Sequence, residues 1–489
     1  MMAGETPPAT SSVSSATPAA AETYSHADEF VTAISRFNLP DLKSLIQNGG
    51  NVNEPLPEGY GPLALACYFS FVDGVKVLVE AGALIHGLPG GKDPATEAAM
   101  RGNIDILNYL MEKGSDLQSV SGILLAAVNG GSVPVIEKLL SSGLNPSQED
   151  VIQSVCSNGN AIVLELLLTA GADMRVHGEG ALLIACKNGH SPVVRRLLVA
   201  GVPASASTDE GVTAVHCASM YGHLAALTFL LESSPAPDVN QTSAGCPTPL
   251  FLAAQGGYDT VVAKLLQSGA NHSIPNNHGV LPVHVAAELG HTAVIHALIF
   301  AGVNINEPCT KSSATALFFA AQSGHVNVVN LLLQAGALPN EARADGTTPL
   351  LISSQTGNSS VVASLLAGSA DPNRKNAAGL TPLLVAVNCN DLLTVNALLA
   401  SGANPNEVDA FQQTPLLRAA KMGYTEVLHA IMQAGADIQY KDTSGMDARA
   451  VAEHNNHTYT TTVIDSFINF GGAAATQSGA WGTNYGYGY

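Results

Sequence analysis

The sequence is poor in basic residues, and this shortage argues against one class of partner. It holds 20 Lys and Arg against 39 Asp and Glu, a formal net charge of −19 over 489 residues. Affinity for nucleic acid comes largely from Lys and Arg on phosphates, so we expect no bulk nucleic-acid binding. The shortage is greatest between Leu197 and Ala342, where Lys264 and Lys311 are the only bases.

Long apolar runs and a metal-type cysteine spacing are also missing. No apolar stretch approaches the ~18 residues that a membrane span needs, so we predict no membrane span. Seven cysteines are present. Three of them, Cys67, Cys156 and Cys186, take the position of the second Ala in the Ala-Ala pair of a unit's predicted first helix. Cysteine there acts as a small apolar filler, so we expect reduced thiols and an intracellular protein, cytoplasmic or nuclear.

The motifs of catalysis are missing as well. Gly59-Tyr60-Gly61 and Gly178-Glu179-Gly180 lack the preceding strand and the third Gly that phosphate-binding loops need. No Gly-x-Ser-x-Gly elbow occurs. Glu453-His454-x-x-His457 could place two imidazoles one helical turn apart, but no third metal ligand stands nearby. We therefore predict that the chain is not an enzyme and has no catalytic residue, metal or cofactor.

What the sequence does have is a repeat. A Gly closing a Leu-Leu-x-x-Gly-Ala-like string recurs in steps of 33, 34, 33, 33 and 33 residues at Gly269, Gly302, Gly336, Ser369 (in place of Gly), Gly402 and Gly435. Earlier copies stand at Gly49, Gly82 and Gly114. A period near 33 indicates stacked supersecondary units, none of which can bury its apolar face alone. A long stacked surface favours binding over chemistry.

One unit, Asp345 to Asn373, shows the local structure to expect. Asp345-Gly346 suits a tight turn, and Thr348-Pro349 suits the N-cap and first position of a helix that Gly357 ends. A second helix follows, with apolar residues on one face. Those residues are Val361, Val362, Leu365 and Leu366.

The recurring strings identify a family resemblance. Thr-Pro-Leu recurs at Thr248, Thr381 and Thr414, and Gly-His recurs at His190, His223, His291 and His325. These residues resemble the ankyrin repeat, whose 33-residue unit carries Thr-Pro-Leu-His-x-Ala. The resemblance implies an all-α solenoid of about fourteen helix-turn-helix repeats with short hairpin loops, over roughly residues 27–470. It also implies that the Gly-His histidines and His284, in the Leu-Pro-Val-His string, are structural.

The pattern varies along the chain and suggests four segments. Three successive repeat steps are short, at 29, 28 and 30 residues, and they run from Gly114 through Gly143 and Gly171 to Gly201. These short steps predict stunted hairpins. Residues 232–237 are an insertion. We predict a disordered Ala/Ser/Pro tail at 1–24 and a disordered Gly/Tyr tail at 471–489. Between them we predict diverged repeats at 25–207 and regular repeats with a C-terminal cap at 208–470. Drift without structural consequence is the alternative.

A partner surface is predicted at what we call the contact row, the two residues before the Gly that ends the first helix of each unit. The ankyrin resemblance implies that this row is the variable surface that contacts and recognises the partner. Its pairs begin at Tyr68, Met100, Val128, Ser157, Lys187, Met220, Gln255, Glu288, Gln322, Gln355, Asn388 and Lys421. The predicted partner-binding residues are Tyr68, Phe69, Arg101, Met220, Tyr221, Gln255, Glu288, Leu289, Glu307, Gln322, Gln355, Asn388, Lys421 and Met422.

These residues predict a non-catalytic scaffold or adaptor that binds a protein or peptide in its groove. The alternative is a structural or mechanical spacer without a dominant site. We expect the middle of the groove to take a basic segment with an apolar anchor, facing Asp209, Glu210, Glu288 and Glu307. We also expect His272, His278 and His284 to gain charge below about pH 6.5 and weaken such binding.

Overall fold

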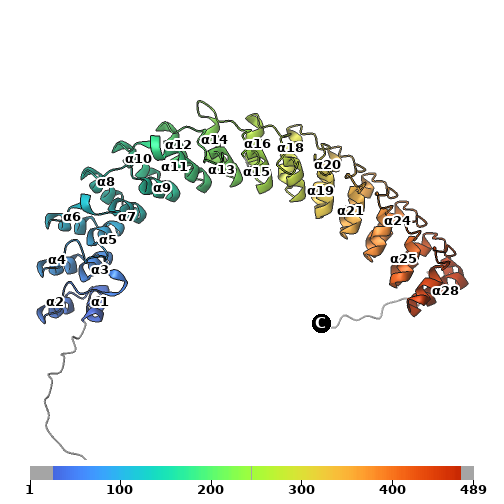
Figure 1. Ribbon diagram of the computed structural model, residues 1–489, viewed down its shortest axis with the longest axis horizontal. Helices are drawn as coiled ribbons and strands as arrows, with labels where there is room; N and C mark the ends of the chain where they lie inside the picture. The colour runs from blue at the N-terminus through green and yellow to red at the C-terminus, as the bar shows by residue number, and fades with distance from the viewer. Residues whose placement is uncertain (1–25, 244, 475–489) are drawn as a thin grey trace, which may run out of the picture. The chain divides into compact units, whose positions relative to one another are not determined.

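The chain folds as a series of helix pairs. The computed structural model describes residues 26–243 and 245–474, and of residues 470–474 only the helical backbone. Within this range lie twenty-eight α-helices and no β-strand. The helices form fourteen consecutive pairs, which confirms the predicted all-α helix-turn-helix solenoid (Figure 1).

The first helix of each pair has an odd number and the second an even number. The odd-numbered helices are α1 (Ala27–Ser35), α3 (Pro62–Tyr68), α5 (Pro94–Met100), α7 (Ile123–Gly130), α9 (Glu149–Asn158), α11 (Met174–Asn188), α13 (Ala214–Met220), α15 (Pro249–Gly256), α17 (Pro282–Glu288), α19 (Ala316–Ser323), α21 (Pro349–Gln355), α23 (Pro382–Asn388), α25 (Pro415–Met422) and α27 (Ala448–His454). The even-numbered helices are α2 (Leu39–Gln47), α4 (Val72–Glu80), α6 (Ile104–Glu112), α8 (Val133–Ser141), α10 (Ala161–Thr169), α12 (Ser191–Val199), α14 (Leu224–Leu231), α16 (Asp259–Gln267), α18 (Thr292–Phe300), α20 (Val326–Gln334), α22 (Ser359–Ala367), α24 (Leu392–Ala400), α26 (Thr425–Gln433) and α28 (Thr458–Ala474). Two 3-10 turns, η1 (Pro57–Gly59) and η2 (Leu117–Ser119), lie in the connections before α3 and α7.

Two compact units divide the chain. The first comprises residues 26–155 and 162–172, and the second comprises residues 156–161 and 173–474. Within the second unit, each odd-numbered helix from α11 to α27 packs against the next odd-numbered helix, and the even-numbered helices do the same. The sequence boundary predicted between residues 207 and 208 stays a prediction. Residues 1–25 and 475–489, which hold most of the predicted tails, lie outside the described residues.

Local capping explains where the first helices begin. In the unit chosen above, the Thr348 side chain accepts a hydrogen bond from the Leu351 amide at 3.2 Å, and Pro349 opens α21. A Thr hydroxyl in this position satisfies an amide that the helix itself leaves unpaired. Thr248, Thr315, Thr381 and Thr414 cap their helices in the same way.

The core runs between the two layers of helices. In α22, Val361, Val362 and Leu365 are fully buried, as their spacing predicted, while Leu366 is half-buried. Full burial of one such side chain contributes about 1.5–3 kcal/mol. Each pair buries this face against its neighbours, so stability depends on stacking.

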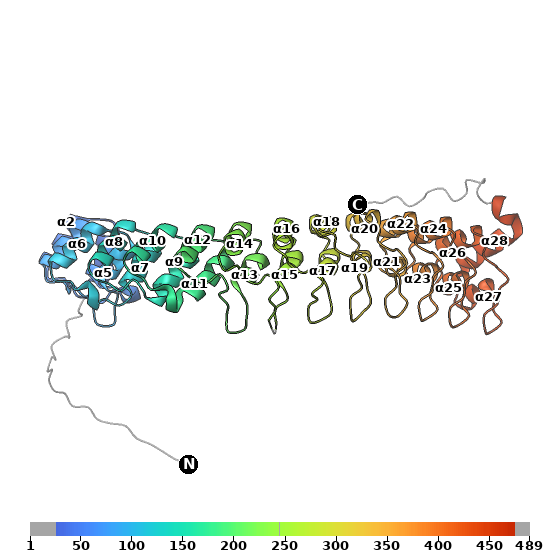
Figure 2. The ribbon, with the colours of Figure 1, turned by 90° about the horizontal axis from the view of Figure 1, so that it is seen from above.

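The connections between pairs come in two kinds. Fourteen residues, 335–348, join α20 to α21, and they form one of the hairpins that project beside the odd-numbered helices (Figure 2). Only residues 142–148 join α8 to α9, and only residues 170–173 join α10 to α11. The hairpins are stunted at these places, as the short repeat steps indicated.

Candidate functional site

The contact row lies at the C-terminal ends of the odd-numbered helices. In the second unit its side chains are exposed from Lys187 to Met422, because the helix face that they occupy is not covered by the neighbouring pairs. In the first unit Arg101 is exposed, whereas Tyr68 and Phe69 are half-buried. Most predicted row residues are therefore available to a partner.

Val128 does not belong to the exposed surface, and its assignment to the row was wrong. Its side chain is only 4% exposed. Helix α7 runs one residue further than the Gly spacing indicated, to Gly130, with Gly131 as its left-handed C-cap. A Cβ on Gly130 would lie 2.0 Å from the Met100 carbonyl oxygen, so only glycine fits there. The surface pair of this repeat is Asn129 and Gly130.

A series of histidines, which we call the histidine ladder, hydrogen-bonds to the backbone of the contact row. In each case a ring Nε2 donates to the carbonyl oxygen of a row residue in the preceding repeat. The pairs are His190 with Ser157 at 2.8 Å, His223 with Lys187 at 3.0 Å, His291 with Gln255 at 3.0 Å, His325 with Glu288 at 2.9 Å and His457 with Lys421 at 3.0 Å. The predicted structural role of the Gly-His histidines is confirmed, and His457 has the same role.

His284 is also structural, but its predicted titration was wrong. The ring is fully buried, its Nδ1 accepts from the Leu281 amide at 3.1 Å, and its Nε2 donates to the Glu307 carbonyl oxygen at 2.8 Å. Burial lowers the pKa of His284 to about 4, because a charged ring would lose its hydration. His284 is therefore neutral near pH 6.5, and it cannot repel a basic ligand there.

The middle of the row combines exposed apolar side chains with carboxylates. Met220 is the last residue of α13 and Tyr221 is its C-cap, and they are 39% and 42% exposed. Leu289, the C-cap of α17, is 46% exposed. Glu288 precedes Leu289 and is exposed, while Glu307 lies half-buried in the hairpin between α18 and α19.

The two basic residues between Leu197 and Ala342 already have partners within the chain. Lys264 lies 3.9 Å from the Glu232 carboxylate, and the Lys311 Nζ donates to the Asn277 carbonyl oxygen at 2.6 Å. Among the described residues, neither forms an ion pair with Glu288 or Glu307. The carboxylates therefore keep their negative potential.

The first unit carries an aromatic part of the row. The Arg101 guanidinium lies 3.8 Å from the centre of the Tyr68 ring, and Tyr68 packs edge-on against Tyr60 and Phe69 at 5.5 and 5.2 Å. The ring centroids of Phe37 and Phe69 lie 6.4 Å apart in an edge-to-face arrangement. Tyr68, Phe69 and Arg101 thus form one cluster, which the separate row positions did not reveal.

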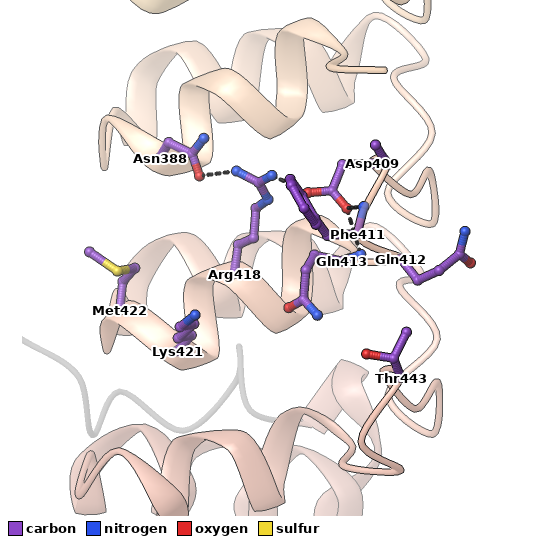
Figure 3. A pocket seen from close by; sticks show the side chains of 10 residues that line it. Asn388, Asp409, Phe411, Gln412, Gln413, Arg418, Lys421, Met422 and Thr443 are labelled. Atoms are coloured by element: carbon purple, nitrogen blue, oxygen red, sulfur yellow. Dashed lines mark hydrogen bonds and ion pairs between the residues drawn. The ribbon is translucent and has the colours of Figure 1, made fainter. Parts of the chain in front are cut away.

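A pocket of about 680 Å³ lies where the row reaches Asn388, Lys421 and Met422 (Figure 3). Its hairpin wall holds Asp409, Phe411 and Gln413, and its helix wall holds Arg418. The Arg418 guanidinium donates to the Asn388 amide oxygen at 2.7 Å and pairs with Asp409. These contacts hold the guanidinium in place between the two walls.

Asp409 is buried and charged. Its side chain is 1% exposed, and that of Arg418 is 19% exposed. Burial acts to raise the pKa of Asp409, but hydrogen bonds from the Gln413 and Phe411 amides and the Arg418 guanidinium together lower it below its usual range. The Arg418–Asp409 pair is therefore a pre-formed ion pair in the lining of the pocket.

Sequence reasoning did not find Arg418, Asp409 and Phe411, although two signals were present. Arg418 takes the position at which Ile352, Val385 and Leu252 stand in other repeats. Gln412 has φ +57° where other hairpins have glycines such as Gly379 at φ +74°, and the exposed Phe411 precedes it. Such departures from a local rule tend to mark functional positions.

Two further observations concern metals and membranes. Among the described residues, no group of three or more His, Cys, Asp and Glu side chains is placed to hold a metal ion. No helix in residues 26–243 and 245–474 is both long enough and apolar enough to cross a membrane.

The stack of helix pairs with an exposed row is a repeat solenoid, and comparison with known proteins gives its family. A family profile described as "Ankyrin repeats (3 copies)" matches residues 30–121, 123–202, 152–243, 236–309, 283–376 and 350–442. The chain therefore belongs to the ankyrin repeat family. Repeats of this family generally mediate protein–protein interaction, and the fold itself is non-catalytic.

Several curated relatives resemble part of the chain. Ankyrin repeat and KH domain-containing protein mask-1 of Caenorhabditis elegans is 29% identical over 268 residues, which are 51% of this chain and 10% of that protein. Probable E3 ubiquitin-protein ligase XBOS33 of Oryza sativa subsp. japonica is 36% identical over 120 residues, 24% of this chain and 23% of that protein. Ankyrin repeat and SOCS box protein 3 of Homo sapiens is 34% identical over 114 residues, 23% of this chain and 22% of that protein. The chain thus spans less than a quarter of the length of each of these relatives.

Proposed function

We propose that the chain is a non-catalytic scaffold or adaptor that binds a protein partner along the contact row of its second unit. The observation that carries the proposal is the exposed apolar trio Met220, Tyr221 and Leu289, set among carboxylates without a basic counterpart in the row. An anchor of this kind in a polar rim is typical of protein interfaces.

The charges favour a basic segment. Glu288 stands in the row, Glu307 lies in a neighbouring hairpin, and no Lys or Arg occurs in the row between Asn188 and Thr356. Opposite charges mainly speed association, so binding should weaken as salt screens them. A basic segment with at least one apolar anchor suits this surface. One anchor can contact Met220 and Tyr221, and Leu289 lies two repeats further along the row.

Catalysis is not part of the proposal. XBOS33 bears the name of a ubiquitin ligase, but the similarity covers only 23% of that protein. The ankyrin repeats that make up this chain form a non-catalytic fold. The scaffold would also act inside the cell, since its cysteines pack as reduced, unpaired thiols among the described residues.

The test compares two variants of the full chain that alter the row. Affinity purification with the wild type identifies candidate partners, and binding of each isolated candidate is then measured. Reversal of Glu288 and Glu307 to Lys should weaken the true partner at least tenfold, about 1.4 kcal/mol. Tyr221→Ala should weaken it by loss of the apolar anchor.

Matched controls separate site effects from charge and exposure alone. Glu80 and Glu112 are exposed at the C-terminal ends of α4 and α6, and reversing both to Lys changes the net charge equally. Phe300→Ala removes an exposed aromatic ring at the end of α18. A partner that loses affinity in the row variants and not in the controls supports the proposal. Binding unchanged by the double reversal and by Tyr221→Ala would overturn it and favour a spacer.

A further inference from the structure

The pocket beside Arg418 presents apolar surface that no described part of the chain covers. Phe411 is 77% exposed and Met422 is 51% exposed, on opposite sides of the pocket. Lys421 stands between them and forms no ion pair within the described residues. The Arg418–Asp409 pair fixes the floor, so the pocket exists before any ligand arrives.

These groups suit an aromatic side chain on an extended, uncharged segment. An ammonium group attracts the face of an aromatic ring, and a Met thioether contacts such a ring favourably. The amides of Asn388 and Gln413 can bond both N–H and C=O groups of an extended backbone. The volume of about 680 Å³ lies in the range of about 300–1,000 Å³ typical of ligand pockets.

We propose that this pocket is occupied by the chain's own segment Trp481–Tyr489. The segment has no charged side chain, and four of its nine residues are the aromatics Trp481, Tyr485, Tyr487 and Tyr489. It lies outside the described residues. Its lack of charge matches a pocket whose buried carboxylate is already paired and whose remaining charge is a single lysine.

The connection to the last repeat makes this occupant accessible. Thr443, in the hairpin before α27, lines the pocket, and α28 of the same repeat ends at Ala474. From Thr443 back to Asn388 the pocket spans two repeats, roughly 20 Å at ~10 Å per repeat. Residues 475–489 can extend to about 50 Å. A tethered segment is present at an effective concentration on the order of millimolar, so modest contacts suffice.

Occupation would have a regulatory consequence. The docked segment would cover Asn388, Lys421 and Met422, so a partner reaching this end of the row must displace it. The middle of the row, at Tyr221 and Glu288, would remain open. The proposal does not rest on partner binding, because docking is tested in the isolated chain.

The first experiment observes the pocket directly by NMR of the full chain with labelled methionine methyl groups. Replacing the four aromatics by Ser should shift the Met422 methyl signal, because ring currents from a docked aromatic disappear. The Met220 signal is the control, since Met220 lies in the same row at α13 and is also exposed. Met422→Leu assigns the signal. An unchanged Met422 signal would overturn the proposal.

The second experiment uses the only tryptophan of the chain, Trp481. We expect Phe411→Ala to shift its fluorescence to longer wavelength and to increase quenching by acrylamide, whereas Phe300→Ala leaves both unchanged. Equal effects of both variants, or no effect of Phe411→Ala, would contradict docking. Both readouts should be independent of protein concentration. A dependence on concentration would assign the occupant to a second copy and overturn the intramolecular arrangement.

Discussion

The repeats with hairpins and the repeats with short connections show which parts of the unit are optional. Helix pairs α9/α10 and α11/α12 have the same buried faces as α23/α24 and α25/α26, although their connections differ in length. In the short connection before α11, residues that would form a hairpin instead extend the helix, which begins at Met174 and has 15 residues. Stacking of helices is therefore sufficient for the fold.

The hairpins add a second set of bonds between repeats. The Asn373 side chain donates to the Gly402 carbonyl oxygen at 3.0 Å and accepts from the Asn404 amide at 2.7 Å in the next repeat. Asn240, Asn306, Asn340 and Asn406 form the same bridge. The short connections instead rely on local caps such as Asp173, which accepts from the Arg175 amide at 3.0 Å. The hairpins thus lend both inter-repeat stability and an additional wall for ligands.

The largest difference should appear on removing the Arg418 charge. Arg418→Met leaves Asp409 buried and unpaired, which should cost about 3–5 kcal/mol of local stability. Hydrogen exchange of α25 amides measures this loss. In the wild type, the lowered pKa of Asp409 means that its ionic contribution is present above about pH 4 and is lost as pH falls through that lowered pKa.

The matched control comes from the short connection. Arg175 and Asp173 form an exposed pair, so Arg175→Met should leave exchange in α11 unchanged. The double variant Asp409→Asn/Arg418→Met should recover much of the loss, since no unpaired charge remains. An equally small effect of Arg418→Met would show that the ionic pair contributes nothing special to the hairpin repeat.

The next effect tests what the two kinds of repeat share, the histidine ladder. A Cβ on Gly290 would lie 2.6 Å from the His325 ring, and one on Gly159 would lie 2.4 Å from the His190 ring. Alanine at either position should cost about 2 kcal/mol, from left-handed backbone strain and displacement of the ring. Thermal unfolding monitored by circular dichroism compares the variants.

Gly302→Ala is the control for backbone strain alone. Gly302 has φ +78°, close to the +77° of Gly290, and a Cβ there would have no atom within 4 Å. Its cost should be about 1 kcal/mol. If Gly302→Ala is as costly as Gly290→Ala, the ladder adds nothing and the shared element is only the glycine turn.

A smaller effect should follow loss of one hairpin bridge. Asn373→Ala removes both bonds to the next repeat and should cost about 1 kcal/mol, because these bonds are exposed to water. Hydrogen exchange around Gly402 reports the loosening. Asn396→Ala, at an exposed position of α24, should cause none. If Asn373→Ala has no effect, the hairpin bridges do not contribute to the stability of the stack.

The smallest perturbation is chemical labelling, which asks whether short connections loosen the helices behind them. Cys156 in α9 and Cys186 in α11 are fully buried, and burial raises the pKa of the Cys156 thiol to about 12. With Cys67, they should react slowly with a thiol reagent, whereas the exposed Cys389 should react faster. Mass spectrometry of peptides gives each rate. Rapid labelling of Cys186 would indicate frequent opening of the short repeat.

The sequence was sufficient for the repeat but not for the pocket. Thr348, Pro349 and Gly357 act locally, within one or two turns of a helix, so their effect on α21 could be predicted from spacing. The pocket depends on Arg418 meeting Asn388 from the preceding repeat and Asp409 from a hairpin. In the sequence alone, Arg418 stands at a position that is apolar in other repeats, and nothing there indicates which residues it contacts. The titration of His284 failed as a prediction for a related reason, because burial is a property of neighbouring repeats.

The histidine ladder gives the solenoid a polarity. Each ring reaches back to the row of the repeat before it, so the five row pairs that have a histidine partner are held by the repeat that follows them. At the end of the series, His457 of the last repeat holds the Lys421 carbonyl oxygen. Removing repeats from the N-terminal side would leave the remaining rows supported, whereas removing the last repeat would release the row that it serves. The final helix pair therefore stabilises the contact row of the preceding repeat, in addition to covering the end of the apolar core.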